Sequence, residues 1–256
     1  MFQSITHTSM TIHQYQKKCF EEYRESIHFP DDACYLHGNP VNPVVPLETA
    51  VGKIMVIGPY PAAKLYYVDD IPDVPLSDGN APFSTEAYFD GKQVRSSVAG
   101  QEMDEVILET LELSREECWM TSLVKVYLFD ELAVKKYHRL RKEVPEQRSK
   151  YMEYANLGMK WIRQEIEIAN PQVIILMGPE VIASMLLVTP EEAKGFMTGE
   201  IVEKKIIWKN SNFICLPNPG DLMDRSARNP WPRQFALKMG PKAKENIRAI
   251  KAQPRI

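Results

Sequence analysis

The chain has 256 residues, of which 44% are hydrophobic and 25% are charged, an ordinary globular composition with enough length for one substantial core. A formal net charge of −3 gives no overall positive field of the kind that indicates nucleic-acid binding. No apolar run approaches the roughly 18–20 residues of a membrane helix, and the N-terminus lacks the apolar region of a secretory signal.

The four cysteines are far apart and include no C-x-x-C pair, so their spacing indicates neither a zinc site nor a disulfide framework. Cys118 and Cys215 lie in apolar runs, which predicts small core residues. The five histidines show no metal-ligand spacing. We therefore expect a cytoplasmic protein with reduced thiols, no membrane segment, no metal and no cofactor, while the oligomeric state stays open.

The first 50 residues predict a helix and a proline-rich lead-in that packs on the core of a domain covering residues 51–256. Apolar side chains recur at helical spacing in Thr11–Ser26, which predicts the first helix. After the prolines, the run "KIMVIG" (Lys53–Gly58) has the length and continuous apolar character of a strand buried on both faces. Residues 59–97 predict a long irregular region, and loops of this length in compact domains tend to be functional.

Helices and strands then alternate along the chain. "AGQEMDEVILETLEL" predicts a helix, "CWMTSLVKVYLF" a second buried strand, and "YMEYANLGMKWIRQEIEIANP" an amphipathic helix stopped at Asn170-Pro171. "QVIILMG" is a third buried strand, and the proline of "PEVIASMLL" suits the first turn of a helix. "IVEKKIIWKNSNFICLPNPG" predicts two more strands with a turn at residues 210–212, and "PKAKENIRAIKA" a last helix.

This alternation predicts an α/β fold with three α/β/α layers around a mostly parallel sheet of four to five strands. In such sheets the ligand edge lies beyond the carboxyl ends of the strands. Three strand ends are therefore candidate sites: Gly58–Pro61, Thr121-Ser122 and Leu216–Pro219.

Taken in order, these stretches resemble the uracil-DNA glycosylase superfamily, and in particular its iron–sulfur branches. That family has a strand ending G-E-A-P-G, a loop aromatic that stacks on the base, and a helix beginning A-G-Q-x-L-D. A strand reading T-N-V-V-K, a strand ending L-G and a terminal H-P follow. The counterparts here are "VIGPYPA", "VAGQEMDEVIL", "MTSLVKV", "IEIANPQVIILMG" and "CLPNPGDLMDR". The resemblance spans about residues 53–231 and implies the glycosylase fold.

Each chemical position of this chain departs from the family pattern. Where the family has a water-positioning carboxylate or asparagine, the chain has Pro59 and Tyr60. The asparagine that reads the uracil edge is replaced by Ser122, which has no amide fork. The histidine that stabilises the departing base is replaced by Asn218, a neutral donor. The resemblance makes Tyr60 and Asn218 the candidate catalytic residues.

The resemblance also implies no iron–sulfur cluster in this chain. The third and fourth cluster cysteines of the family correspond to Val126 and approximately to Gly158, and a cluster needs thiolates. Cys19 and Cys34 are too loosely spaced to be a convincing remnant of the N-terminal pair.

The candidate substrate-binding residues surround the first strand end. For the turn of Gly58, Pro59 and Pro61, either Tyr60 walls a base pocket and the Gly58 region offers backbone N–H groups to a ligand, or the segment is only a rigid turn with a packed tyrosine. Asn218 either enters the pocket or only satisfies its own turn. Phe83 or Phe89 is the candidate aromatic for stacking on an extruded base, with packing as a core lid as the alternative. Asp69, Asp70 or Asp90 could replace the missing carboxylate, although solvated loop acids are the more common explanation.

The segment "PGDLMDRSARNPW" lies where glycosylases insert an apolar wedge into DNA. By that resemblance Leu222 and Met223 would be the wedge, and Arg225 and Arg228 would bind phosphates. The alternative is a plain surface loop.

Three functions follow as hypotheses. The first is a divergent DNA N-glycosylase that flips and excises a damaged or deaminated base. The second is a glycosylase-fold module with impaired chemistry that binds nucleic acid, a nucleobase or nucleotide, or a protein partner. The third, an unrelated nucleotide-binding domain, is disfavoured because the chain has neither G-x-G-x-x-G after a strand nor a Walker lysine motif.

Overall fold

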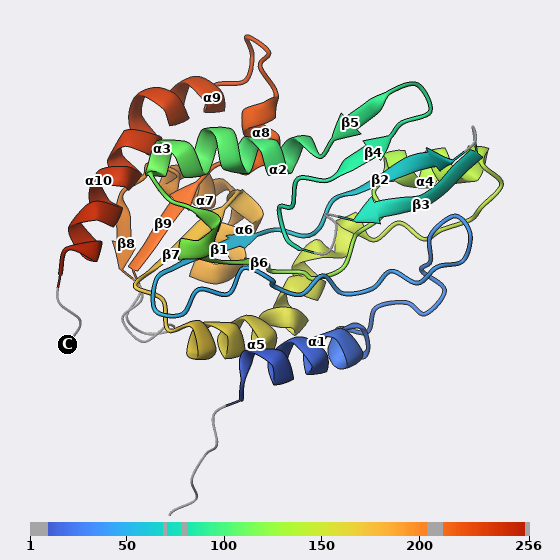
Figure 1. Ribbon diagram of the computed structural model, residues 1–256, viewed down its shortest axis with the longest axis horizontal. Helices are drawn as coiled ribbons and strands as arrows, with labels where there is room; N and C mark the ends of the chain where they lie inside the picture. The colour runs from blue at the N-terminus through green and yellow to red at the C-terminus, as the bar shows by residue number, and fades with distance from the viewer. Residues whose placement is uncertain (1–9, 69–70, 78–80, 204–211, 254–256) are drawn as a thin grey trace, which may run out of the picture.

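Four parallel strands and one antiparallel strand form the central sheet of the protein (Figure 1). The computed structural model describes residues 10–68, 71–77, 81–203 and 212–253. The strand order is β6-β1-β7-β9-β8, and β8 pairs antiparallel with β9. The strands are β1 (Ile54–Gly58), β6 (Cys118–Ser122), β7 (Val173–Met177), β8 (Ile201–Glu203) and β9 (Asn212–Leu216). The predicted fold class is confirmed.

The parallel register brings the predicted strand ends to one edge of the sheet. Gly58 at the end of β1 pairs with Ser122 at the end of β6, and Met177 of β7 pairs with Leu216 of β9. Every residue of β1, β6 and β7 is buried, as expected for continuous apolar runs covered on both faces.

Helices cover both faces of the sheet (Figure 1). Helix α5 (Tyr151–Ala169) lies on one face with α1 (Ile12–Ser26) beside it, and α2 (Val98–Glu102), α3 (Glu109–Leu111) and α10 (Gly240–Lys251) lie on the other. The remaining helices are α4 (Glu131–Arg139), α6 (Pro179–Leu186), α7 (Pro190–Phe196), α8 (Pro219–Met223) and α9 (Trp231–Gln234). Short helical turns are the π-type η1 (Met103–Leu108) and η4 (Phe235–Met239) and the 3₁₀-type η2 (Arg115–Glu117) and η3 (Arg148–Lys150). No helix in these described ranges is long and apolar enough to cross a membrane.

The region predicted to be irregular contains two antiparallel ribbons, so that prediction is wrong. Strands β2 (Ala63–Val68) and β3 (Ile71–Ser77) form one ribbon, and β4 (Ala87–Phe89) and β5 (Val94–Ser96) form the other. Proline usually indicates a break in a strand. In a two-stranded ribbon, however, each strand has one edge without a partner strand, and a missing N–H at that edge costs little. Pro72 and Pro75 therefore fit within β3.

Three other expectations about elements need correction or fall outside the described residues. The second buried strand ends at Ser122, well short of residue 129, because its neighbour β1 ends at Gly58. Helices α4 and α7 occupy segments for which no helix was predicted. In the predicted turn at residues 210–212, residues 210 and 211 lie outside the described ranges, while Asn212 begins β9.

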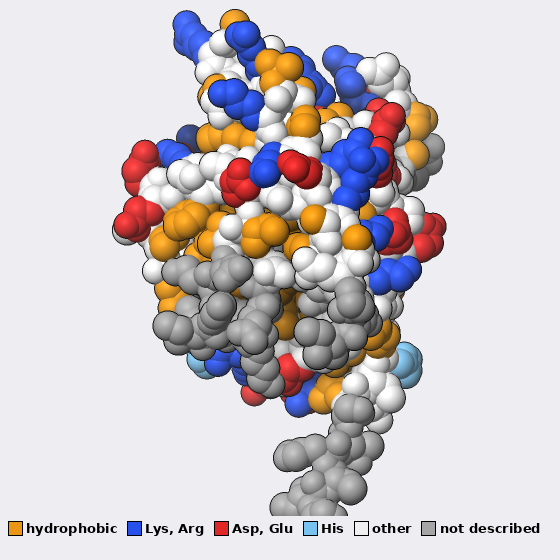
Figure 2. All heavy atoms as spheres, turned by 90° about the vertical axis from the view of Figure 1, so that its left-hand side faces the viewer, with side chains coloured by type: hydrophobic (Ala, Val, Ile, Leu, Met, Phe, Trp, Pro, Cys, Tyr) orange, Lys and Arg blue, Asp and Glu red, His pale blue; other side chains and the backbone are white. Residues whose placement is uncertain are grey.

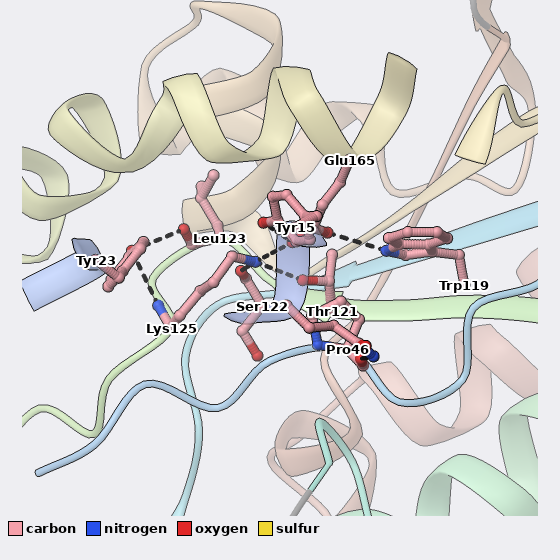
Figure 3. A network of polar contacts seen from close by, with 10 residues as sticks. Tyr15, Tyr23, Pro46, Trp119, Thr121, Ser122, Leu123, Lys125 and Glu165 are labelled. Atoms are coloured by element: carbon pink, nitrogen blue, oxygen red, sulfur yellow. Dashed lines mark hydrogen bonds and ion pairs between the residues drawn. The ribbon is translucent and has the colours of Figure 1, made fainter. Parts of the chain in front are cut away.

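A buried ion pair joins three elements beneath the sheet edge (Figure 3). Lys125 Nζ lies 2.5 Å from Glu165 Oε1 of α5, and both side chains are 0% exposed. The ammonium group also donates to Thr121 Oγ1 at 2.6 Å and to the Ser122 carbonyl at 3.1 Å. Tyr15 of α1 and Trp119 of β6 donate to Glu165 at 2.5 and 3.0 Å. Desolvating two charges costs several kcal/mol per ion unless the remaining bonding capacity is filled, and these contacts fill it.

Tyr23 extends this network to the chain that follows β6. Its hydroxyl accepts from the Lys125 amide at 3.0 Å and donates to the Leu123 carbonyl at 3.4 Å. A Cβ on Gly158 of α5 would lie 2.8 Å from that hydroxyl, so the glycine is required for α1 to approach α5.

The predicted core role of two cysteines is confirmed. Cys118 and Cys215 are 0% exposed, and Cys19 in α1 is buried as well. Burial raises the pKa of each of these three thiols to about 12, so they stay protonated and unreactive at neutral pH.

Because Lys125 and Glu165 are buried together, we expect their substitutions to have coupled effects on the free energy of unfolding. Lys125→Met leaves Glu165 charged and unpaired, and we expect it to lower the free energy of unfolding by about 3–5 kcal/mol. Lys125→Met combined with Glu165→Gln removes the stranded charge but keeps hydrogen-bonding capacity for Tyr15 and Trp119, so it should recover much of that loss. Urea denaturation of wild type, both single variants and the double variant measures the coupling. Additive losses would contradict a coupled pair.

Candidate functional site

An aromatic ring lies directly on the end of the first strand. A Cβ on Gly58 would come within 2.2 Å of Phe83 Cζ, so only glycine permits this contact. Phe83 is 6% exposed and has a φ of 59°, a conformation that is uncommon for residues other than glycine and often marks functional segments. Its carbonyl accepts from Arg115 Nη2 at 2.5 Å, and this bond holds the backbone in place.

The A-G-Q motif positions the segment that carries Phe83. A Cβ on Gly100 would lie 2.4 Å from the Ser84 carbonyl oxygen and 2.8 Å from the Thr85 amide nitrogen. The start of α2 therefore packs backbone to backbone against this segment, and no side chain fits between them.

Ser122 and Tyr60 are both next to the first strand end, since Ser122 pairs with Gly58 and Tyr60 follows Gly58 by two residues. Ser122 is 2% exposed, and its carbonyl is held by Lys125. Tyr60 is half-buried between Pro59 and Pro61, which are both buried. Its ring packs edge-on against Tyr151 of α5, with ring centroids 6.1 Å apart. The two prolines therefore fix the Tyr60 ring at the edge of the sheet. The contacts of this ring decide whether the turn also serves as a pocket wall.

Asn218 caps α8 at the end of the fourth strand. Its Oδ1 accepts from the Gly220 amide at 3.3 Å. A Cβ on Gly178, which has a φ of +92°, would lie 3.3 Å from Asn218 Cβ and 3.7 Å from both its Nδ2 and Glu180 Oε2. The carboxylate of Glu180 and the amide that stands in the family's histidine position therefore both border Gly178.

Arg148 and Glu180 were not predicted as site residues. Arg148 Nη2 donates to Glu180 Oε1 at 2.9 Å, and its guanidinium lies 4.1 Å from the centre of the Tyr60 ring. A row of contacts therefore runs from Tyr60 and Tyr151 through Arg148 to Glu180, and Glu180 borders Gly178 as Asn218 does. One sequence signal points to it: in "LMGPEV", Glu180 follows the third strand end by two residues.

Two polar atoms in this row have no hydrogen-bond partner among the described residues. They are Arg148 Nη1 and the hydroxyl of Tyr151, and both are buried. Tyr151 is only 4% exposed. Buried groups of this kind normally bind protein, water or a ligand, so each of these two atoms has open bonding capacity for a water molecule or a ligand.

A second carboxylate lies beside the row. Burial raises the pKa of the Asp221 carboxyl, the Asn218 backbone amide lowers it by hydrogen bonding, and the negative charge of Glu180 raises it. The Asp221 carboxyl therefore holds its proton more tightly than an exposed aspartate does.

The predicted wedge is only partly compatible with the structure. Leu222 is 0% exposed in the core cluster, so in this conformation it cannot enter a duplex; α8 packs against α2 and turns this side chain inward. Met223 is half-buried. Arg225 forms an ion pair with Glu102 of α2 at 2.7 Å, whereas Arg228 is exposed.

The other candidate residues, Phe89 and the loop acids, lie away from the first strand end or outside the described ranges. Phe89 is half-buried in the β4–β5 ribbon, and it is Phe83 that contacts the first strand end. The Asp90 carboxylate binds Arg95 and the Lys92 and Gln93 amides, and these bonds lower its pKa to about 2. It is a turn acid and a poor base. Residues 69 and 70, also proposed as acids, lie outside the described ranges.

The residues present do not fit an iron–sulfur cluster. Val126 is buried in the core, and Gly158 faces Tyr23. Within the described ranges, no three side chains of histidine, cysteine, aspartate or glutamate come together as a metal site.

The fold is therefore a mostly parallel α/β sheet, with an aromatic ring, a buried serine and an asparagine amide at or against the carboxyl ends of its strands. Residues 48–239 match the Uracil DNA glycosylase superfamily, and the chain belongs to this family. A comparison with curated proteins finds no match. The predicted family is confirmed, and the roles of its individual site residues stay predictions.

The raised pKa of Asp221 predicts a pH-dependent stability. The folded protein binds this proton more tightly than the unfolded chain does, so this stability is complete at low pH and is lost as pH rises through the folded pKa. We expect Asp221→Asn to be more stable than wild type at about pH 8 and the difference to shrink toward about pH 4. Urea denaturation across that range measures it, with exposed Asp31→Asn as control. A constant difference at all pH values would contradict this origin.

Proposed function

We propose that the protein captures a nucleobase extruded from DNA at the carboxyl edge of its sheet and hydrolyses the N-glycosidic bond. The observation that carries this proposal is the position of Phe83 on Gly58, beside Ser122. A glycosylase needs an aromatic face for the flipped base and polar groups for its edge, and these residues supply them in the order that the family motifs follow.

Family membership supports the choice of substrate. The reaction breaks the bond between C1′ and the base nitrogen, and negative charge develops on the departing base. Hydrogen-bond donors that meet this charge lower the barrier, and Ser122 and the Asn218 amide are such donors. A cytoplasmic location belongs to the same proposal, which suits the four free cysteines.

A second candidate is a module that binds a base without cleaving it. It is favoured by the absence of a carboxylate at Pro59 and Tyr60 and by the tight cover of Phe83 and Ser122, which are 6% and 2% exposed. For either candidate, capture of a base requires Phe83 to move, because its ring is covered in this conformation.

Cleavage separates the two candidates. The protein is incubated with single- and double-stranded DNA containing uracil, hypoxanthine, xanthine or a thymine mismatch, and abasic sites are measured. We expect at least one of these bases to be released. Binding without abasic sites on any substrate would favour the module instead, and absence of both would remove DNA bases as ligands.

The two aromatic candidates provide a matched pair of variants. Base stacking contributes about 1–3 kcal/mol, so Phe83→Leu should lower kcat/KM about tenfold to a hundredfold. Phe89→Leu, an identical change on the β4–β5 ribbon, should leave kcat/KM unchanged. Equal effects of the two variants would show that Phe83 has no special part in base recognition.

The salt dependence of binding tests the DNA-facing surface. Figure 2 shows lysine and arginine side chains gathered at the upper end of the molecule, where Figure 1 places the segment between α8 and α9. Arg228 in this segment is exposed. Arg228→Gln should weaken DNA binding and reduce the slope of log K against log[salt] by about 1.

The matched control is Lys17→Gln, an equal loss of charge on exposed α1, across the sheet from α8 (Figure 1). Equal slopes for the two variants would show that DNA does not bind at the segment between α8 and α9. Arg225 is a less clean probe because its charge already pairs with Glu102.

A further inference from the structure

The two family positions that carry the chemistry are uncharged in this chain, but a charged pair lies between them. Tyr60 and Asn218 occupy those positions. Arg148 lies over the Tyr60 ring at 4.1 Å, and Glu180 shares the space next to Gly178 with the Asn218 amide. Arg148 and Glu180 are thus at the same edge of the sheet as the family's catalytic positions, but they belong to η3 and α6.

We propose that Arg148 and Glu180 supply the two charges of glycosidic cleavage: Glu180 activates the water, and Arg148 stabilises the departing base anion. This inference rests on the proposed function. It assigns a carboxylate from the third strand end to the task that the family gives to the first strand end.

The reaction balances with these groups. The bond between C1′ and the base nitrogen breaks, and its electron pair leaves with the base, while the sugar becomes an oxocarbenium ion. The water oxygen forms a bond to C1′ and its proton passes to the Glu180 carboxylate. That proton then leaves for solvent or the base, and no oxidant or reductant is required.

The unpartnered atoms support Arg148 as the anion-binding group. Only Nη2 of Arg148 meets Glu180, whereas Nη1 is buried without a partner among the described residues. The Tyr151 hydroxyl is buried as well, and the Arg148 guanidinium lies 5.4 Å from the Tyr151 ring centre. Burial and the charge of Glu180 raise the pKa of this hydroxyl, and the charge of Arg148 lowers it, so both charges act on it. Two donors with open bonding capacity therefore lie next to the carboxylate, as an anion-binding site needs.

The pair is held firmly and stays open to water. The amides of Gln147 and Arg148 both donate to the Phe129 carbonyl, at 2.8 and 3.2 Å, and Gln147 is itself buried. The side chains of Arg148 and Glu180 are 28% and 35% exposed. The backbone of Arg148 is therefore fixed, while water can reach the carboxylate.

The first experiment compares Glu180→Gln with wild type in single-turnover cleavage of the base that wild type releases. Loss of a general base lowers rates by about 10²–10⁴-fold, and we expect a loss in this range with unchanged DNA binding. The amide of this variant can still accept a hydrogen bond from Arg148, and thermal denaturation checks that the variant folds. Glu191→Gln on exposed α7 is the matched control and should cleave normally. Wild-type rates in Glu180→Gln would overturn the proposal.

The role of Arg148 has a separate readout. Arg148→Met should slow release of uracil more than release of 5-fluorouracil, because the better leaving group depends less on stabilisation of its negative charge. A purely structural role for Arg148 would slow both bases by the same factor, and that result would overturn its assignment.

A binding measurement distinguishes failure of this inference from failure of the proposed function. Duplexes carry either a cationic pyrrolidine, which mimics the oxocarbenium ion, or a neutral tetrahydrofuran at the abasic position. We expect wild type and Glu191→Gln to prefer the pyrrolidine about tenfold or more, and Glu180→Gln to lose that preference. If wild type releases no base, the proposed function fails. A Glu180-dependent preference would still support the placement of charge, whereas no preference, or one that survives Glu180→Gln, would overturn it.

Discussion

The ion pair between Lys125 and Glu165 is the interaction on which the sheet edge depends. It is fully buried, so it is tolerated only because Tyr15, Trp119 and Thr121 complete its hydrogen bonds. Those partners come from α1 and β6, while Glu165 comes from α5. The same ammonium group holds the Ser122 carbonyl, and thus a charge in the core fixes the backbone at the point where the second strand turns into the site.

Close approaches at three glycines build the remainder of the edge. Gly58 admits the Phe83 ring, Gly100 admits the backbone beside it, and Gly178 admits Asn218 and Glu180. At each position a Cβ would meet a neighbour at 3.3 Å or less. Packing this tight leaves little freedom for relaxation, so the arrangement of the site is set by backbone contacts as much as by the side chains that carry chemistry.

The sheet and its edge were predictable because they rest on local, periodic features: continuous apolar runs, followed by turns at Gly58, Ser122 and Asn218. Features that depend on distant contacts were not. The ribbon containing Pro72 was hidden because proline signals a break unless the strand lacks a neighbour. The burial of Leu222 depends on how α8 meets α2. Arg148 and Glu180 are 32 residues apart, and the only sequence signal for the pair is the place of Glu180 just after the third strand end.

Residues far apart in sequence can serve one site in this fold, so the positions of the catalytic groups can change while the fold stays the same. All parallel strands deliver their carboxyl ends to one edge, so a charge lost after β1 can be replaced after β7 with no change in topology. The new carboxylate then needs a cationic partner that offsets its repulsion of the departing base anion, and Arg148, supported by Tyr60, meets that need. With Glu180 in the proposed role, Tyr60 has a physical task at the position where the family pattern has a carboxylate or asparagine: its ring supports the guanidinium that pairs with Glu180.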